Sequence, residues 1–202
     1  MTDVTGSGTP MIDLEPAARR IALLAEGVTN DQLTAPTPCP GCAVRNMLGH
    51  LIGLSVAFRD AGRKELGETT GTPPNAVVPD IEDGESWRTE LPQRLDELTA
   101  TWRDPEAWEG MTQAGGLTFP AAEAGRVALN ELLIHGWDLA RATGQPYDPD
   151  TLSLEASYAM LAPTANERPP GGPFGPAVEI PADAPLLDRV IGLSGRDPSW
   201  KP

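Results

Sequence analysis

Apolar residues recur at intervals of three and four in four long stretches of the chain, which is the period of a helix with one buried face. These stretches cover residues 13–28, 43–63, 87–102 and 120–144. In the third stretch Pro92 either starts the helix or kinks it, because proline cannot donate a backbone hydrogen bond. The pattern therefore predicts four long helices.

The remaining segments are rich in proline, glycine and polar residues, so residues 29–42, 66–81 and 108–119 are predicted to be connections. Shorter amphipathic patterns occur at 152–161 and at 186–193. We find no convincing strand period, internal repeat or Gly-rich phosphate loop. The expected fold is all-α, a four-helix bundle with an irregular Pro/Gly-rich C-terminal segment.

The chain has 202 residues, enough for one principal domain. We expect residues 1–10 to be a disordered N-terminus, because they are polar and Gly/Thr-rich. Residues 11–165 should form the bundle, and residues 166–202 a C-terminal extension that packs on it. The oligomeric state stays open between monomer and homodimer.

Acidic residues outnumber basic ones by 29 to 15, and the formal net charge is −14. Such a charge repels nucleic acid and anionic membrane surfaces, and no basic cluster offsets it. No apolar run approaches the roughly 20 residues that cross a bilayer, and the amino terminus lacks the features of a signal peptide. We therefore expect a cytoplasmic protein that binds neither nucleic acid nor membranes.

Cys39 and Cys42 form a C-P-G-C sequence just before the second predicted helix. Such a pair can be a redox centre, because a thiolate is stabilised near a helix N-terminus. The pair could also supply two of the four ligands of a structural zinc site. The sequence fits this less well, since the chain has no second Cys/His pair of similar spacing. We favour structural thiols that cover the helix, and leave open the redox pair and a mixed metal site with the two histidines.

The segment NELLIHGWD places Glu131 four residues before His135, so both side chains project from one face of a helix. That face is apolar, and a buried glutamate needs a compensating charge. A metal cation could compensate this charge. Alternatively, the glutamate could form an ion pair with Arg126 or Arg141, or it could be protonated. If the second and fourth helices are neighbours, His50 joins the pair as a His₂Glu ligand set with an open coordination position.

Three segments together resemble a known family: TPCPGCAVRNMLGHL, NELLIHGWDLARATGQP and PADAPLLDRVIGLSGRDPSW. They look like the actinobacterial, mycothiol-dependent maleylpyruvate isomerase-like proteins of the DinB superfamily. The resemblance implies a DinB-like four-helix bundle whose divalent metal is held by His50, Glu131 and His135. It implies zinc as the first choice of metal, with nickel or iron as alternatives. The sequence departs from the family at Cys42 and Ala43, where relatives commonly have Trp and Thr.

The resemblance also implies an activity, a metal-dependent transferase or isomerase that uses the thiol mycothiol on a small electrophile. Asp138 is a candidate for orienting His135, because it lies one turn further along the helix, although it could instead pair with Arg141. Arg45 and Arg126 are candidates for holding an anionic substrate or thiol. The alternative is a non-catalytic, metal-stabilised bundle that binds a small ligand or a protein partner.

Overall fold

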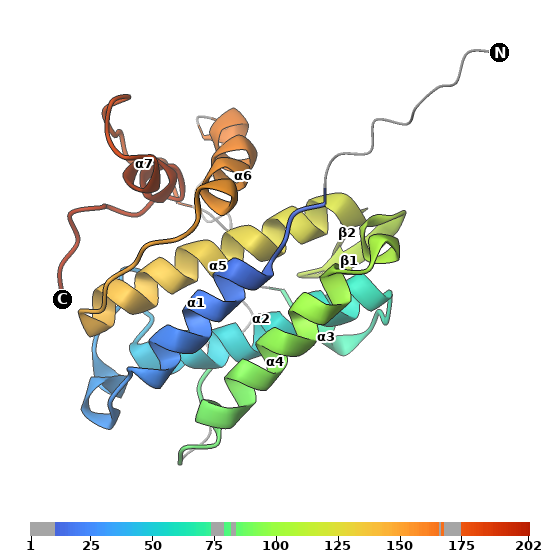
Figure 1. Cartoon of the computed structure of the whole chain (residues 1–202), viewed down its shortest axis with the longest axis horizontal. Coiled ribbons are helices and arrows are strands. Elements are labelled where there is room, and N and C mark those ends of the chain that lie inside the picture. The colour runs from blue at the N-terminus through green and yellow to red at the C-terminus, as the bar shows by residue number, and fades with distance from the viewer. Residues whose placement is uncertain (1–10, 74–78, 82–83, 166, 168–174) are drawn as a thin grey trace.

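Four long helices form the body of the protein. The structure is a computed structural model, and it describes residues 11–73, 79–81, 84–165, 167 and 175–202. The four helices are α1 (Glu15–Glu26), α2 (Val44–Arg63), α4 (Trp87–Trp102) and α5 (Ala121–Thr143) (Figure 1). The predicted all-α bundle is confirmed. Helix α4 begins at Trp87, so Pro92 lies inside it.

Local sequence explains where several helices begin and end. The Asp13 carboxylate accepts a hydrogen bond from the backbone N–H of Glu15 at the start of α1. Helix α5 ends at Gly144, whose φ of 70° is a left-handed conformation that glycine adopts without steric cost. Helix α2 ends in the same way at Lys64, with φ of 62°.

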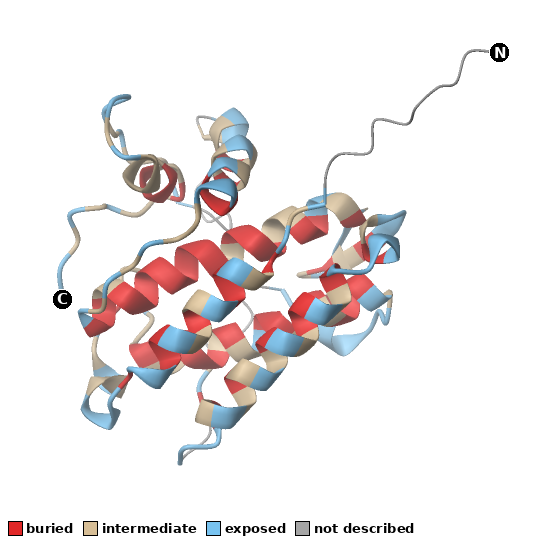
Figure 2. Cartoon of the chain, viewed as in Figure 1, coloured by how far each residue is buried: buried red, intermediate tan, exposed pale blue. Residues whose placement is uncertain are grey.

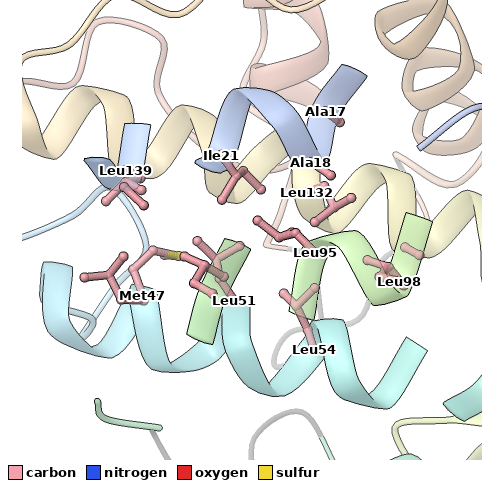
Figure 3. Packing of buried hydrophobic residues seen from close by; sticks show 14 of the residues in the cluster. Ala17, Ala18, Ile21, Met47, Leu51, Leu54, Leu95, Leu98, Leu132 and Leu139 are labelled. Carbon is pink, nitrogen blue, oxygen red and sulfur yellow. The ribbon is translucent and has the colours of Figure 1, made fainter. Parts of the chain in front are cut away.

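The bundle core lies between these four helices, as the close view in Figure 3 shows. Helices α1 and α2 each pack against both α4 and α5. They therefore occupy opposite corners of the bundle, and α2 and α5 are neighbours. The side chains that meet in the centre are fully or nearly fully buried; they include Ile21, Met47, Leu51, Leu95, Leu98, Leu132 and Leu139.

Helix α5 is buried on two sides, and most of its ribbon is coloured red, as buried, in Figure 2. Its outer face carries Leu133, Ile134 and Trp137, which join a second apolar cluster. That cluster is completed by residues of α6 (Thr151–Leu161) and α7 (Leu186–Leu193). A helix that is apolar around most of its circumference has to be covered on both faces, and the C-terminal segment supplies the second cover.

Two segments differ from the predicted connections. Residues 108–119 were expected to be irregular, but they contain an antiparallel hairpin of β1 (Met111–Ala114) and β2 (Leu117–Pro120). Residues 66–81 contain a single helical turn, α3 (Glu68–Gly71). The two segments hold each other through a hydrogen bond between Thr70 Oγ1 and Gln113 Oε1 at 3.1 Å, a tertiary contact that no local pattern indicates.

The predicted disorder of residues 1–10 lies outside the described residues, as do residues 168–174 of the Pro/Gly-rich segment. Residues 175–185, which follow the second of these gaps, contain no helix or strand. Short 3₁₀ helices of three to five residues occur at Asn30–Thr34, Pro105–Trp108 and Ala162–Thr164. Among the helices that the structure describes, none has the length and apolar character needed to span a membrane.

Two helical glycines make a matched pair for testing the packing of the bundle. A Cβ atom on Gly125 of α5 would lie 2.5 Å from the Trp108 ring, whereas a Cβ on Gly53 of α2 would meet nothing within 4 Å. Gly125→Ala should therefore destabilise the protein by about 1–3 kcal/mol through overpacking. Gly53→Ala should be neutral or stabilise it by up to about 1 kcal/mol, because alanine favours the helix.

Chemical denaturation of the two variants beside the wild type measures this difference. A Gly125→Ala variant as stable as Gly53→Ala would show that the indole does not press on α5 as described.

Candidate metal centre

Helix α5 presents three polar side chains on one face, at positions i, i+4 and i+7. They are Glu131, His135 and Asp138, and their spacing brings each close to the next along the helix. Glu131 Oε2 lies 3.1 Å from His135 Nε2, and His135 Nδ1 lies 2.9 Å from Asp138 Oδ2. Each ring nitrogen of His135 is therefore within hydrogen-bonding distance of a carboxylate oxygen.

The fourth polar side chain, His50, comes from the neighbouring helix α2. Its Nε2 lies 3.6 Å from Glu131 Oε2, and its ring stands edge-on to the His135 ring with the centroids 4.7 Å apart. The packing of α2 against α5 thus places the two imidazoles on either side of one carboxylate. The structure brings together the three residues that the spacing singled out.

The geometry of the three side chains fits a divalent metal. One ligand atom from each of His50, Glu131 and His135 can be chosen so that all lie within 4.8 Å of one another. Ligands about 2.0–2.1 Å from a tetrahedral zinc are separated by about 3.4 Å, close to the 3.1 and 3.6 Å from Glu131 Oε2 to the two Nε2 atoms. The side chains of His50 and Glu131 keep 26% and 19% exposure, so the group is open to solvent on one side.

Asp138 is completely buried and is held by two partners. One is His135, and the other is Arg196, which comes from the C-terminal segment beyond α7. The Arg196 guanidinium contacts both carboxylate oxygens, with Nη2 at 3.0 Å from Oδ2 and Nε at 3.3 Å from Oδ1. By accepting from Nδ1–H of His135, Asp138 would fix the tautomer that leaves Nε2 free to bind a metal.

Burial and charge pull the pKa values of this cluster in opposite directions. Burial alone would lower the pKa of His135, but the hydrogen bonds with Asp138 and Glu131 outweigh it and raise that pKa to about 9. Burial would raise the pKa of Glu131, but hydrogen bonds with His135 and His50 hold that pKa far below its usual value. At neutral pH without a metal, an imidazolium therefore lies between two carboxylates.

The other predicted site residues lie elsewhere. Arg45 pairs with Asp80 at 2.6 Å, and Arg126 pairs with Glu123 on its own helix at 2.5 Å. Arg141 donates to the carbonyl oxygens of Pro198 and Trp200 and so holds the C-terminal segment. These contacts include neither Glu131 nor Asp138. Glu131 lies against His50 and His135, and the arginine that contacts Asp138 is Arg196.

Arg196 is the residue of this cluster that the sequence did not indicate. It follows Asp138 by 58 positions and lies in a segment without periodic pattern. The two cysteines do not belong to the metal-ligand group found among the described residues. The burial of Asp138 is the signal that could have indicated Arg196, because a buried carboxylate requires a compensating cation.

The fold and this cluster together define a class of protein, a four-helix bundle with a His₂Glu candidate metal centre formed by side chains of α2 and α5. The sequence profile of the mycothiol maleylpyruvate isomerase N-terminal domain matches residues 14–140, more than half of the chain. The chain therefore belongs to this family, and the family resemblance is confirmed. The first of the three segments and most of the second lie within the matched residues.

Individual proteins are also similar to this chain. Two Mycobacterium tuberculosis proteins, from strains CDC 1551 and H37Rv and both named only as uncharacterized, are 29% identical over 202 residues, covering 93% of this chain and 97% of each relative. The crystal structure of a histidine-to-alanine mutant of the mycothiol-dependent maleylpyruvate isomerase matches with a TM-score of 0.60 and 18% identity. The enzyme without that mutation gives 0.55 and 19%. Both matches cover 74% of this chain and 68% of the other, and at these identities they establish the fold.

Replacing Arg196 tests whether it holds the buried carboxylate. Arg196→Met should lower the free energy of unfolding by about 3 kcal/mol, because Asp138 would keep a charge with only one partner in the interior. Arg141→Met is the matched control: it removes another arginine that holds the same segment, and should cost only about 1 kcal/mol because its acceptors are neutral carbonyls. Denaturant titration measures both, and equal losses would contradict this role.

The raised pKa of His135 predicts proton release on metal binding. Below a pH of about 9 its imidazole carries the extra proton, which has to leave before Nε2 can bind a cation. Titrating Zn²⁺ into chelator-treated protein at pH 7 should release about one proton from this residue. The release should fall as the pH rises through about 9, where the imidazole becomes neutral by itself. Calorimetry in buffers of different ionisation enthalpy measures it; a constant release between pH 7 and 10 would contradict the assignment.

Proposed function

We propose that this protein binds a divalent metal through His50, Glu131 and His135 and acts as a mycothiol-dependent S-transferase or isomerase on a small electrophile. The observation that carries the proposal is the meeting of three ligand atoms within 4.8 Å of one another from two helices. Family membership supports the choice of thiol, because the solved relatives are described as mycothiol-dependent. Zinc is the first choice of metal, and nickel or iron would accept the same ligand types.

Each residue of the cluster has a definable task. His50, Glu131 and His135 would hold the metal, and a metal held there would lower the pKa of a bound thiol and so supply a thiolate at neutral pH. Asp138 orients the His135 ring, and Arg196 balances the charge of Asp138. Because His50 and Glu131 remain partly exposed, a small thiol can approach from the solvent side.

Charge favours an anionic ligand at this place, although the chain as a whole is acidic. Glu131 and Asp138 contribute two negative charges, which Arg196 and the His135 imidazolium balance in the metal-free cluster. Exchanging that one proton for a divalent cation leaves these four side chains and the ion with an excess of one positive charge. A thiolate is therefore attracted to a protein whose net charge is −14.

Metal content is the first test. The wild-type protein purified without chelator should carry about one divalent ion per chain, and His50→Ala, Glu131→Gln and His135→Ala should each lose most of it, since three ligands are the minimum for such a site. Asp60→Asn is a suitable control, because Asp60 is another nearly buried carboxylate, paired with Arg59 on α2. It lies about 15 Å along the helix from His50 and should keep the metal.

Elemental analysis of the five proteins gives the answer, and equal metal in all of them would end the site assignment. The activity is tested separately, by following the consumption of mycothiol with chlorodinitrobenzene as a model electrophile. Thiol loss that chelator abolishes supports the enzyme. A protein that keeps its metal but never consumes thiol with any electrophile would be the non-catalytic bundle.

A further inference from the structure

Cys39, Pro40, Gly41 and Cys42 form a tight turn directly before α2. The Cys42 N–H donates to the Cys39 carbonyl oxygen at 3.2 Å, and Gly41 has a φ of 73°. Proline in the second position and a glycine with positive φ in the third are the marks of a type II β-turn. The first and last Cα atoms of such a turn lie less than about 7 Å apart, within the range that a disulfide spans.

The surrounding chain fixes this turn. Pro36 and Ala43 form an antiparallel bridge at its base. Thr37 Oγ1 donates to the Cys42 carbonyl at 2.8 Å and accepts from the Cys39 N–H at 3.2 Å. The two cysteines, both free and half-buried, are thus held at opposite ends of one rigid turn, and closing a disulfide between them needs little backbone movement.

The electrostatic surroundings make the two thiols unequal. A hydrogen bond from Cys42 lowers the pKa of Cys39 to about 6 against the effect of burial, and the positive charges of Arg196 and His135 lower it further while Asp138 opposes them. The same hydrogen bond and burial raise the pKa of Cys42. One thiolate beside one thiol at neutral pH is the arrangement of reactive dithiols.

We infer that Cys39 and Cys42 form a thiol–disulfide exchange centre that reacts with low-molecular-weight disulfides, with Cys39 attacking and Cys42 resolving. This function is separate from the candidate metal centre, because neither cysteine belongs to the metal-ligand group of the described residues. The geometry of the turn carries the inference, because it holds the two cysteines within reach of each other.

The reaction balances without a further cofactor. The Cys39 thiolate attacks one sulfur of the small disulfide RSSR, which forms a Cys39–S–S–R bond and expels RS⁻. Cys42 then loses its proton to the solvent and attacks the Cys39 sulfur, which closes the Cys39–Cys42 disulfide and expels a second RS⁻. Two protein thiols are oxidised, and one small disulfide is reduced to two thiols.

The test uses the full chain, fully reduced and then mixed with glutathione disulfide at pH 7. Alkylation and mass spectrometry follow the thiols with time. The wild type should reach an intramolecular disulfide and release two glutathione thiols per chain. Cys42→Ser should stop at a mixed disulfide on Cys39. Cys39→Ser should react at least about fivefold more slowly than Cys42→Ser, because the remaining thiol is mostly protonated.

Three results would overturn the inference. The wild type could remain a dithiol at glutathione redox ratios found in a cytosol, the two single variants could react at equal rates, or the wild-type mixed disulfide could persist without closing. Circular dichroism of each serine variant shows whether the turn substitution has disturbed the bundle. A repeat of the exchange with Thr37→Val, which keeps both cysteines but loses the Oγ1 hydrogen bonds of the turn, should show slower closure but an unchanged first step.

The outcome is distinguishable from that of the metal proposal. Glu131→Gln removes a metal ligand but leaves both cysteines and Arg196, so it should lose metal and keep disulfide exchange. Loss of exchange in Cys39→Ser with full metal content is the reciprocal result. Failure of either proposal therefore leaves the other measurable.

Discussion

The carboxylate of Asp138 is the constraint on which the site depends. It is fully withdrawn from solvent, so its charge has to be matched by partners within hydrogen-bond distance. His135 and Arg196 provide that match, the first from the same helix and the second from the C-terminal segment. The orientation of the imidazole and the position of the C-terminal segment are consequently parts of one electrostatic arrangement.

This arrangement explains why α5 is covered on both faces. Its inner face completes the bundle core, while Leu133, Ile134 and Trp137 on the outer face pack under α6 and α7. The apolar contact positions the C-terminal segment, and the hydrogen bonds from Arg141 to the Pro198 and Trp200 carbonyls hold its end. The apolar packing of α6 and α7 on α5 thus brings Arg196 close to the buried carboxylate of Asp138.

The sequence predicted those features that are encoded locally. Helical spacing located the four long helices and placed Glu131 and His135 on one face, because these relations repeat within a few residues. The hairpin at 111–120 was not predicted, because each strand has only four residues and β2 shows no regular alternation of burial. Its position depends on distant contacts such as the hydrogen bond from Thr112 Oγ1 to the Ala61 carbonyl. The role of Arg196 was not predicted either, because its partner Asp138 is distant in sequence. The sequence predicted that His50 lies near α5 only if α2 and α5 are neighbours, and it did not show which helices are neighbours.

One further consequence follows from the way in which the ligand set is divided between helices. Glu131 and His135 belong to a single rigid helix, so their mutual distance is nearly fixed, whereas His50 approaches them only as closely as α2 is allowed to approach α5. That approach is set by interlocking apolar side chains such as Met47, Leu51 and Leu139, which are completely buried (Figure 3). If the three side chains hold a metal as proposed, this apolar packing would set the distance of His50 from the other two ligands. Shortening these apolar side chains would then alter the metal preference without replacing any of the three.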